Sequence, residues 1–319
     1  MGRGRGSTAV APRMSPPSRV GDRVFSGLTL LMAITVVILI CMVGWELWDG
    51  SRMSIRTFGF GFLLSSDWDP SHDLYGALPF IYGTLVSSFL ALLIAVPLSV
   101  ATAIYLTELA PLWIRQPLIS LVEMLAAIPS VILGLWGIFV MVPWMRATVL
   151  PWLRHYLGWC PLFHGVIYGS CMLAGGMIIA IMVIPIITSV SREILISVPA
   201  LQREAAYALG ATRWEVTRIA VLSYAKRGIF GAVTLGLGRA LGETMAVTMV
   251  IGNKAEISAS LFAPGYTLAS VIASEFRESS DLHLQSLFEI GLVLFLVTIL
   301  VNLLAQLILK TFAGATVKQ

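Results

Sequence analysis

Charged side chains are scarce in this sequence. They make up 12% of its 319 residues, whereas soluble domains usually contain roughly 25%. Hydrophobic residues make up 57%, more than a soluble domain of this length can bury, and they form continuous runs rather than the alternation of a membrane β-barrel. The composition therefore excludes a soluble enzyme, a disordered regulator and a β-barrel, and it predicts an all-α integral membrane protein.

Cysteines and nucleotide-binding motifs are also few or lacking. Cys41, Cys160 and Cys171 have no metal-ligand spacing, and two of them fall in apolar segments, so we expect no metal site and no structural disulfide. The sequence has no Gly-x-x-x-x-Gly-Lys-Ser/Thr run, hence no P-loop of its own. The net charge of +4 is typical of cytoplasmic loops in a membrane protein rather than of nucleic-acid binding. We expect no cofactor and no catalytic residues.

Six apolar segments are long enough to cross a bilayer, which takes about 20 helical residues. The predicted spans are Val24–Trp45, Pro79–Leu106, Leu118–Met141, Ser170–Val190, Ile229–Ile251 and Leu287–Leu309. Together they define a transmembrane domain over residues 21–312, preceded by a tail over residues 1–20 whose composition is typical of disorder. Prolines at positions 97, 129 and 185 fall inside three spans, where they tend to kink a helix.

The distribution of basic residues indicates which side of the membrane each loop faces. With the N-terminus in the cytoplasm, the outside segments 46–78, 142–169 and 252–286 hold only a minority of the 21 lysines and arginines: Arg52, Arg56, Arg146, Arg154, Lys254 and Arg277. All others except Arg239 fall on the inside, so the positive-inside rule places both termini in the cytoplasm. The tryptophans of the middle outside segment favour an interfacial helix.

The inside segment Ser191–Gly228 has the pattern of a helix, a glycine turn and a second helix. Residues 200–209 have strong helix-forming composition, and Gly210 stands where a glycine often ends a helix. Thr212 and Glu215 then form a capping box for the next helix. The structural interpretation is a helical hairpin that only connects two spans. The functional interpretation is a docking element for another protein.

Glu204, Ala205 and Ala206, followed by Gly210, resemble the EAA motif of ABC-importer permeases. In that family the motif forms a coupling helix that sits in a groove of the ATPase, and it precedes the next-to-last span, as here. The resemblance therefore implies that these four residues couple the chain to a separate ATPase.

Two ionisable residues of opposite charge lie within the fifth predicted span. Arg239 and Glu243 are four residues apart, so on one helix they would share a face and pair. Such residues inside a membrane often mark a substrate pathway, although a pair that only fixes helix packing remains the alternative. Arginine binds phosphate oxygens bidentately, and the carboxylate could accept a hydrogen bond from the proton of hydrogen phosphate, which sulfate lacks.

The surrounding sequence is similar to one of the two permeases of phosphate-specific ABC importers, the C-type permease. The similarity is carried by Gly238–Val247, Leu261–Ser270, Ala127–Val131 and Gly134–Gly137, and it covers roughly residues 20–312. It implies a type I ABC importer permease with a six-helix core in the bacterial inner membrane. Phosphate would be the substrate, and Arg239 and Glu243 would lie in its pathway.

The same resemblance implies specific partners. These are the homologous A-type permease of the phosphate system, a dimer of ATPase subunits and a periplasmic phosphate-binding protein, in addition to membrane lipid. The acidic outside segments also favour delivery of the anion by a carrier protein.

Four alternatives compete with this interpretation. The chain can be an ion-coupled secondary anion transporter, although no internal repeat is evident. It can be a permease for another tetrahedral oxyanion, such as molybdate or sulfate, or the A-type rather than the C-type permease. An intramembrane enzyme would need a nucleophile with a base, or a carboxylate pair, at membrane depth, and Glu243 is the only acid placed deep in a predicted span.

Overall fold

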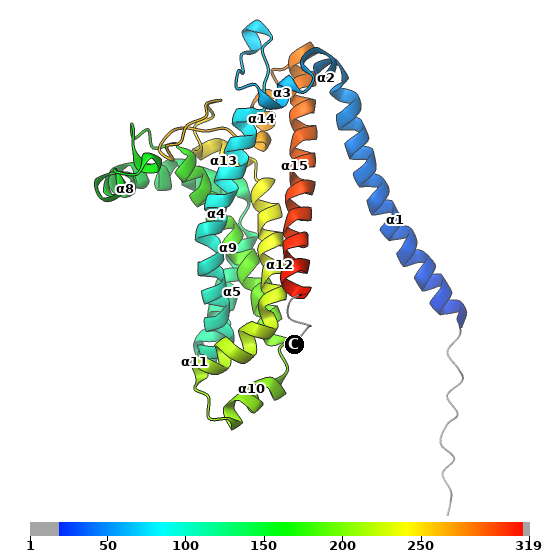
Figure 1. The fold of residues 1–319 in the computed structure, drawn as a ribbon, viewed down its shortest axis with the longest axis vertical. Helices are drawn as coiled ribbons and strands as arrows, with labels where there is room; N and C mark the ends of the chain where they lie inside the picture. Colours follow the sequence, from blue (N-terminus) through cyan, green and yellow to red (C-terminus); the bar gives the residue numbers. More distant parts are fainter. Residues whose placement is uncertain (1–18, 315–319) are drawn as a thin grey trace, which may run out of the picture. The chain divides into compact units, whose positions relative to one another are not determined.

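The computed structural model describes residues 19–314 of the chain, which are shown in Figure 1. The chain divides into two units between Glu46 and Leu47, and each is described by itself. Residues 19–314 contain helices and two isolated β-bridges but no extended strand. Of the tail expected at residues 1–20, residues 1–18 lie outside the described part.

The helices are α1 (Arg19–Gly50), α2 (Arg52–Phe58), α3 (Gly61–Leu64), η1 (Pro70–His72), α4 (Leu78–Ile104), η2 (Tyr105–Leu109), α5 (Leu112–Ala127), α6 (Ser130–Trp136), η3 (Gly137–Met141), α7 (Val142–Trp144), η4 (Met145–Val149), α8 (Leu150–Leu157), η5 (Pro161–Phe163), α9 (Met172–Ile196), α10 (Ala200–Ala208), α11 (Arg213–Glu215), η6 (Val216–Val221), α12 (Leu222–Leu241), α13 (Met245–Val250), α14 (Leu268–Glu275) and α15 (Asp281–Gly314). Here η1 and η5 are 3₁₀ turns, and η2, η3, η4 and η6 are π-helical turns.

Among the described residues, 5 helical runs are long and apolar enough to cross a membrane. They are Gly21–Gly50, Leu78–Leu109, Ser130–Leu157, Met172–Ile196 and Asp281–Leu309. Four of them overlap the expected spans at 24–45, 79–106, 170–190 and 287–309 closely. The remaining two expected spans, the third and the fifth, are each broken in the structure.

The third expected span, 118–141, is divided between two helices. α5 ends at Ala127 and α6 begins at Ser130, because Pro129 between them has extended backbone angles (φ −58, ψ 139) and no N–H to donate. From Ser130 the helical run continues to Leu157 through two π-helical turns. The structure therefore shifts the long apolar helix of this region toward the middle outside segment.

The fifth expected span, 229–251, is also in two parts. α12 ends at Leu241, and α13 begins at Met245 after a short break. α13 packs against α6 at Gly134, where an added Cβ would lie 3.0 Å from the Ala246 Cα. Two broken helices thus meet at a contact that only a glycine permits.

α9 is the central helix of the second unit, because it packs along both α4 and α12. Around it lies the central cluster of buried apolar side chains, which includes Ile178, Val183, Ile187, Val247 and Phe262. In Figure 1, α10 and α11 lie at one end of this bundle, whereas α2, α3 and α14 lie at the other. These ends correspond to the segments that the sequence places on opposite sides of the membrane.

Each end of the bundle has a smaller apolar cluster of its own. The α10-end cluster consists of Ala103, Leu195, Val198, Val221 and Ala225. The α14-end cluster consists of Phe62, Tyr75, Ala77, Phe80, Tyr266, Leu268, Val271, Leu287, Ile290 and Val293. The two clusters hold the loops and short helices of each end against the long helices.

Candidate functional site: a charged pair at an intramembrane cavity

Arg239 lies in the last turn of α12, and its side chain is 49% exposed. It lines a cavity of about 790 Å³ between α9, α12 and α15. A half-exposed arginine in this place is unusual, because most of the surrounding surface is apolar. The cavity therefore has one fixed positive charge that is open to a ligand or to another protein.

Glu243 lies beyond the end of α12, and not on the same helical face as Arg239 as the sequence suggested. α12 stops at Leu241 because the chain turns at Gly242, and Glu243 occupies the break before α13. Its side chain is only 8% exposed, and Oε2 lies 3.8 Å from Arg239 Nη2. This distance allows Coulombic attraction but exceeds that of a hydrogen bond, so the guanidinium keeps its donors for other acceptors.

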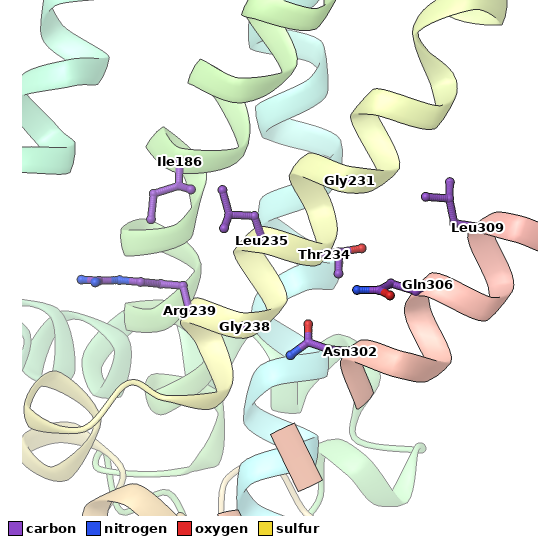
Figure 2. A pocket seen from close by; sticks show the side chains of 9 residues that line it. All are labelled: Ile186, Gly231, Thr234, Leu235, Gly238, Arg239, Asn302, Gln306 and Leu309. Carbon is purple, nitrogen blue, oxygen red and sulfur yellow. The ribbon is translucent and has the colours of Figure 1, made fainter. Parts of the chain in front are cut away.

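The same cavity is lined by three polar side chains that the sequence did not indicate as part of the site. Thr234 belongs to α12, and Asn302 and Gln306 belong to α15. Figure 2 shows all three between α12 and α15, whereas Arg239 extends alongside Ile186 of α9. The sequence contained one signal for these residues: the amides of Asn302 and Gln306 stand four residues apart in an otherwise apolar run. The cavity thus combines one cation with neutral hydrogen-bonding groups.

The EAA segment forms an exposed helix at the end of the bundle. Glu204, Ala205 and Ala206 lie on α10 and Gly210 just after it, where its φ of +82 lies in the left-handed region that favours glycine. Glu204 and Ala205 are exposed and Ala206 is half-buried. The four residues therefore stand together on an accessible surface.

The turn after α10 has the capping box expected from the sequence. The Thr212 side chain accepts from the Glu215 N–H, and the Glu215 carboxylate accepts from the Thr212 N–H. These hydrogen bonds hold the pKa of Glu215 below its usual value, because they stabilise the carboxylate. The start of α11 is thereby defined locally and does not depend on packing.

At the α14 end, Tyr266, Trp68 and His283 converge on the Glu275 carboxylate. Trp68 Nε1 donates to Oε2 at 3.0 Å, Tyr266 donates to Oε1 at 3.2 Å, and His283 Nε2 lies 3.0 Å from Oε2. Burial raises the pKa of Tyr266 to about 12. Every member of this group contacts another, which indicates a structural role. Among the described residues, no three His, Cys, Asp or Glu side chains are arranged to hold a metal ion.

Comparison with known proteins defines the class of this chain. Residues 95–316 match the model of the family described as binding-protein-dependent transport system inner membrane component. The chain belongs to this family, and its EAA segment is the motif that the family carries. It is therefore a multi-pass inner-membrane protein and part of a transporter complex rather than an enzyme.

Two named relatives and one solved structure are similar to this chain over most of its length. The chain is 48% identical to the phosphate transport system permease protein PstC of Pasteurella multocida, over 90% of this chain and 91% of that protein. It is 47% identical to the protein of the same name from Mesorhizobium japonicum, over 92% of each chain. Among solved structures, a bacterial ABC transporter involved in import of the acidic polysaccharide alginate has the same fold, with 16% identity, a TM-score of 0.59 and coverage of 92% of this chain and 99% of that one.

Proposed function

We propose that this chain is a permease subunit of an ATP-driven phosphate importer and forms half of its transmembrane pathway. The observation that carries the proposal is the half-exposed Arg239 at the intramembrane cavity, in a chain that is 48% identical to a phosphate transport permease over most of its length. A fixed cation with free donors in an apolar environment suits an oxyanion better than a neutral solute.

Glu243 has a different part in this proposal. Its buried carboxylate lies 3.8 Å from the guanidinium, so it repels a fully deprotonated dianion but can accept a hydrogen bond from the O–H of hydrogen phosphate. Sulfate has no such proton at neutral pH. Arg239 would thus supply attraction and Glu243 would supply discrimination between the two anions.

The exposed α10 surface is the proposed site of coupling to a separate ATPase. Leu201 and Leu209 are 77% and 90% exposed, and they flank Glu204 and Ala205. Large apolar side chains with this exposure, on and just after a helix at the outer end of the bundle (Figure 1), are typical of a partner interface. In this assembly both termini and α10 face the cytoplasm, where a dimer of ATPase subunits binds.

The other partners follow from the same proposal. The homologous A-type permease completes the pathway, because this chain forms half of it in the proposal. A periplasmic phosphate-binding protein delivers the anion to the opposite end of the bundle, which carries α2, α3 and α14.

The test is uptake by the reconstituted complex in proteoliposomes with the binding protein present. We expect accumulation of labelled phosphate that requires ATP and exceeds sulfate uptake, and a Glu243→Gln variant in which this preference falls. Accumulation driven by a proton gradient without nucleotide would instead favour an ion-coupled secondary transporter. Sulfate or molybdate uptake that exceeds phosphate uptake would assign a different oxyanion.

A further inference from the structure

Arg203 is the residue through which α10 makes its ionic contact with the bundle. Within α10 only Arg203 and Ala206 are half-buried, and the other residues of the helix are exposed. The Arg203 side chain is 23% exposed and that of its partner Glu108 is 15% exposed. The contact is therefore largely shielded from water, unlike an ordinary surface ion pair.

The guanidinium of Arg203 binds three acceptors from two other elements. Nη2 donates to Glu108 Oε1 at 3.0 Å and to the Leu195 carbonyl at 2.8 Å. Nη1 donates to the Val198 carbonyl at 2.5 Å. This planar, forked geometry is specific to arginine. One side chain thus joins α10 both to η2, which follows α4, and to the end of α9.

The carbonyl acceptors explain why a cation fits here. Leu195 lies in the last turn of α9, which ends at Ile196, and Val198 lies just beyond. Carbonyls at the end of a helix lack partners within the helix, and the helix dipole places partial negative charge there. Arg203 therefore stabilises the end of α9 as well as pairing with Glu108.

The α10-end cluster lies next to this contact and connects it to α12. Leu195 and Val198 belong to the cluster, as do Ala103 of α4 and Ala225 of α12. α9 and α12 also approach closely at Gly228, where an added Cβ would lie 2.6 Å from Ile194. Packed side chains thus connect the Arg203 contact to the helix that carries Arg239.

We infer that the Arg203–Glu108 ion pair is a positioning pair that transmits movement of α10 to α4, α9 and α12. The inference rests on the proposed binding of α10 to an ATPase, and it adds a distinct step. The ATPase moves α10 through the surface around Glu204, and the Arg203–Glu108 pair transmits this movement to the membrane helices. Loss of the pair should leave the ATPase bound and active but separate ATP hydrolysis from transport.

The test uses the purified complex in proteoliposomes and compares Glu108→Gln with wild type. Three quantities are measured: ATPase retained on purification, ATP hydrolysed and phosphate transported per ATP. The matched control is Glu193→Gln, because Glu193 pairs with the adjacent Arg192, at 2.5 Å, and its side chain is 65% exposed. A second variant, Arg203→Gln, and the double variant test whether the two residues act together.

We expect Glu108→Gln to keep the bound ATPase while the phosphate transported per ATP falls by about fivefold or more, the lower range of coupling between distant sites. The double variant should be no worse than Arg203→Gln alone, Arg203→Lys should recover part of the ratio, and Glu193→Gln should match wild type. An unchanged ratio in Glu108→Gln and Arg203→Gln would overturn the inference. So would loss of the ATPase from these complexes, since the pair would then serve assembly.

Two further variants keep this inference distinct from the docking proposal. Glu204→Lys and Gly210→Val change the exposed surface without touching the Arg203 contacts, and they should release the ATPase or abolish substrate-stimulated hydrolysis. If both retain normal stimulated hydrolysis, the docking proposal fails. The result for Glu108→Gln still reports on transmission by the ion pair.

Discussion

The side chains of Arg239 and Glu243 lie close together but differ in their exposure to solvent. This difference in exposure separates their roles. The Arg239 side chain is 49% exposed and that of Glu243 is 8% exposed. A pair that served only to hold two elements together would bury both charges. The arginine instead remains available at the cavity, whereas the carboxylate stands behind it in the break between α12 and α13.

Exchange of the two charges tests this interpretation. Arg239→Gln should lower phosphate uptake by about tenfold or more, because a hydrogen bond to a charged group is worth roughly 1.5–3 kcal/mol. In the doubly reversed variant, Arg239→Glu with Glu243→Arg, attraction between the residues is restored. The positive charge, however, moves from the last turn of α12 into the break before α13, where the side chain is less exposed.

We therefore expect the reversed variant to assemble at normal levels and to remain inactive in labelled-phosphate uptake. Substantial uptake by this variant would show that only the attraction between the two charges matters, and Arg239 would then have no role in the pathway.

Tyr266 gives the α14 end a dependence on alkaline pH. It is 6% exposed, and burial raises its pKa from 10.0 to about 12. The folded protein thus keeps the phenol neutral at a pH where the unfolded chain ionises it. The stabilisation is complete below pH 10 and is lost as pH rises toward about 12.

A series of thermal unfolding measurements between pH 9 and 12 tests this dependence. The loss of melting temperature with pH should be smaller in Tyr266→Phe than in wild type, although the variant also loses the hydrogen bonds to Ser274 and Glu275. Tyr156→Phe is the control, because Tyr156 is 61% exposed. Equal slopes in wild type and Tyr266→Phe would contradict the assignment.

At the scale of elements, the contact between α6 and α13 depends on the absence of a side chain. A Cβ at Gly134 would lie 2.7 Å from Met249 Sδ and 3.0 Å from the Ala246 Cα. The sulfur can move, but the backbone atom cannot move without shifting α13. Gly134→Ala should therefore destabilise the protein by about 1–3 kcal/mol, the usual cost of overpacking.

Gly231→Ala is the matched control for this contact, because nothing lies within 4 Å of its added Cβ. In the middle of α12, alanine should stabilise the helix slightly. Thermal unfolding in detergent measures both variants. Gly134→Ala with the same melting temperature as Gly231→Ala would indicate that α6 and α13 are loosely packed.

The sequence predicted four of the long helices well because continuous apolar runs of sufficient length have few alternatives in a bilayer. It could not predict the breaks. Prolines at positions 97 and 185 lie inside α4 and α9, whereas Pro129 separates α5 from α6. All three prolines lack an N–H, so the difference comes from the packing around each helix, which periodicity does not report.

The candidate site was predictable in part for a related reason. Charges within apolar runs made Arg239 and Glu243 candidates, and a local pattern indicated the EAA segment with its capping box. Glu108 and Arg203 are 95 residues apart, and each lies in a segment predicted to face the inside, where charges are common. Their pairing follows only from the packing of α4 and α9, so no local pattern indicates it.

At the scale of the whole molecule, the proposed orientation places Cys160 outside and α10 inside. Cys160 is partly exposed and Cys171 is buried. A membrane-impermeant thiol reagent added to right-side-out vesicles should label a variant that retains only Cys160, and Ala208→Cys, on exposed α10, should react only after the membrane is opened. Labelling of Ala208→Cys in intact vesicles would contradict the orientation.

The two ends of the bundle also differ in the side chains that hold them together. At the α14 end, aromatic rings pack edge to face, as Trp68 does on Phe80 at 4.9 Å and Phe80 does on Tyr266 at 5.3 Å. The cluster at the other end consists of alanines, valines and one leucine. Because aromatic rings are large and rigid, we expect the α14 end to be the stiffer one and rotations of α4 to pivot about it.

When a long helix rotates about one end, a small angle moves its other end by a large distance. α4 has 27 residues and is about 40 Å long. A tilt of about 5° about the aromatic end moves the opposite end by about 3.5 Å over that length. Small angular changes that leave the rings in contact thus become displacements as large as an atom's diameter where α10 meets Glu108.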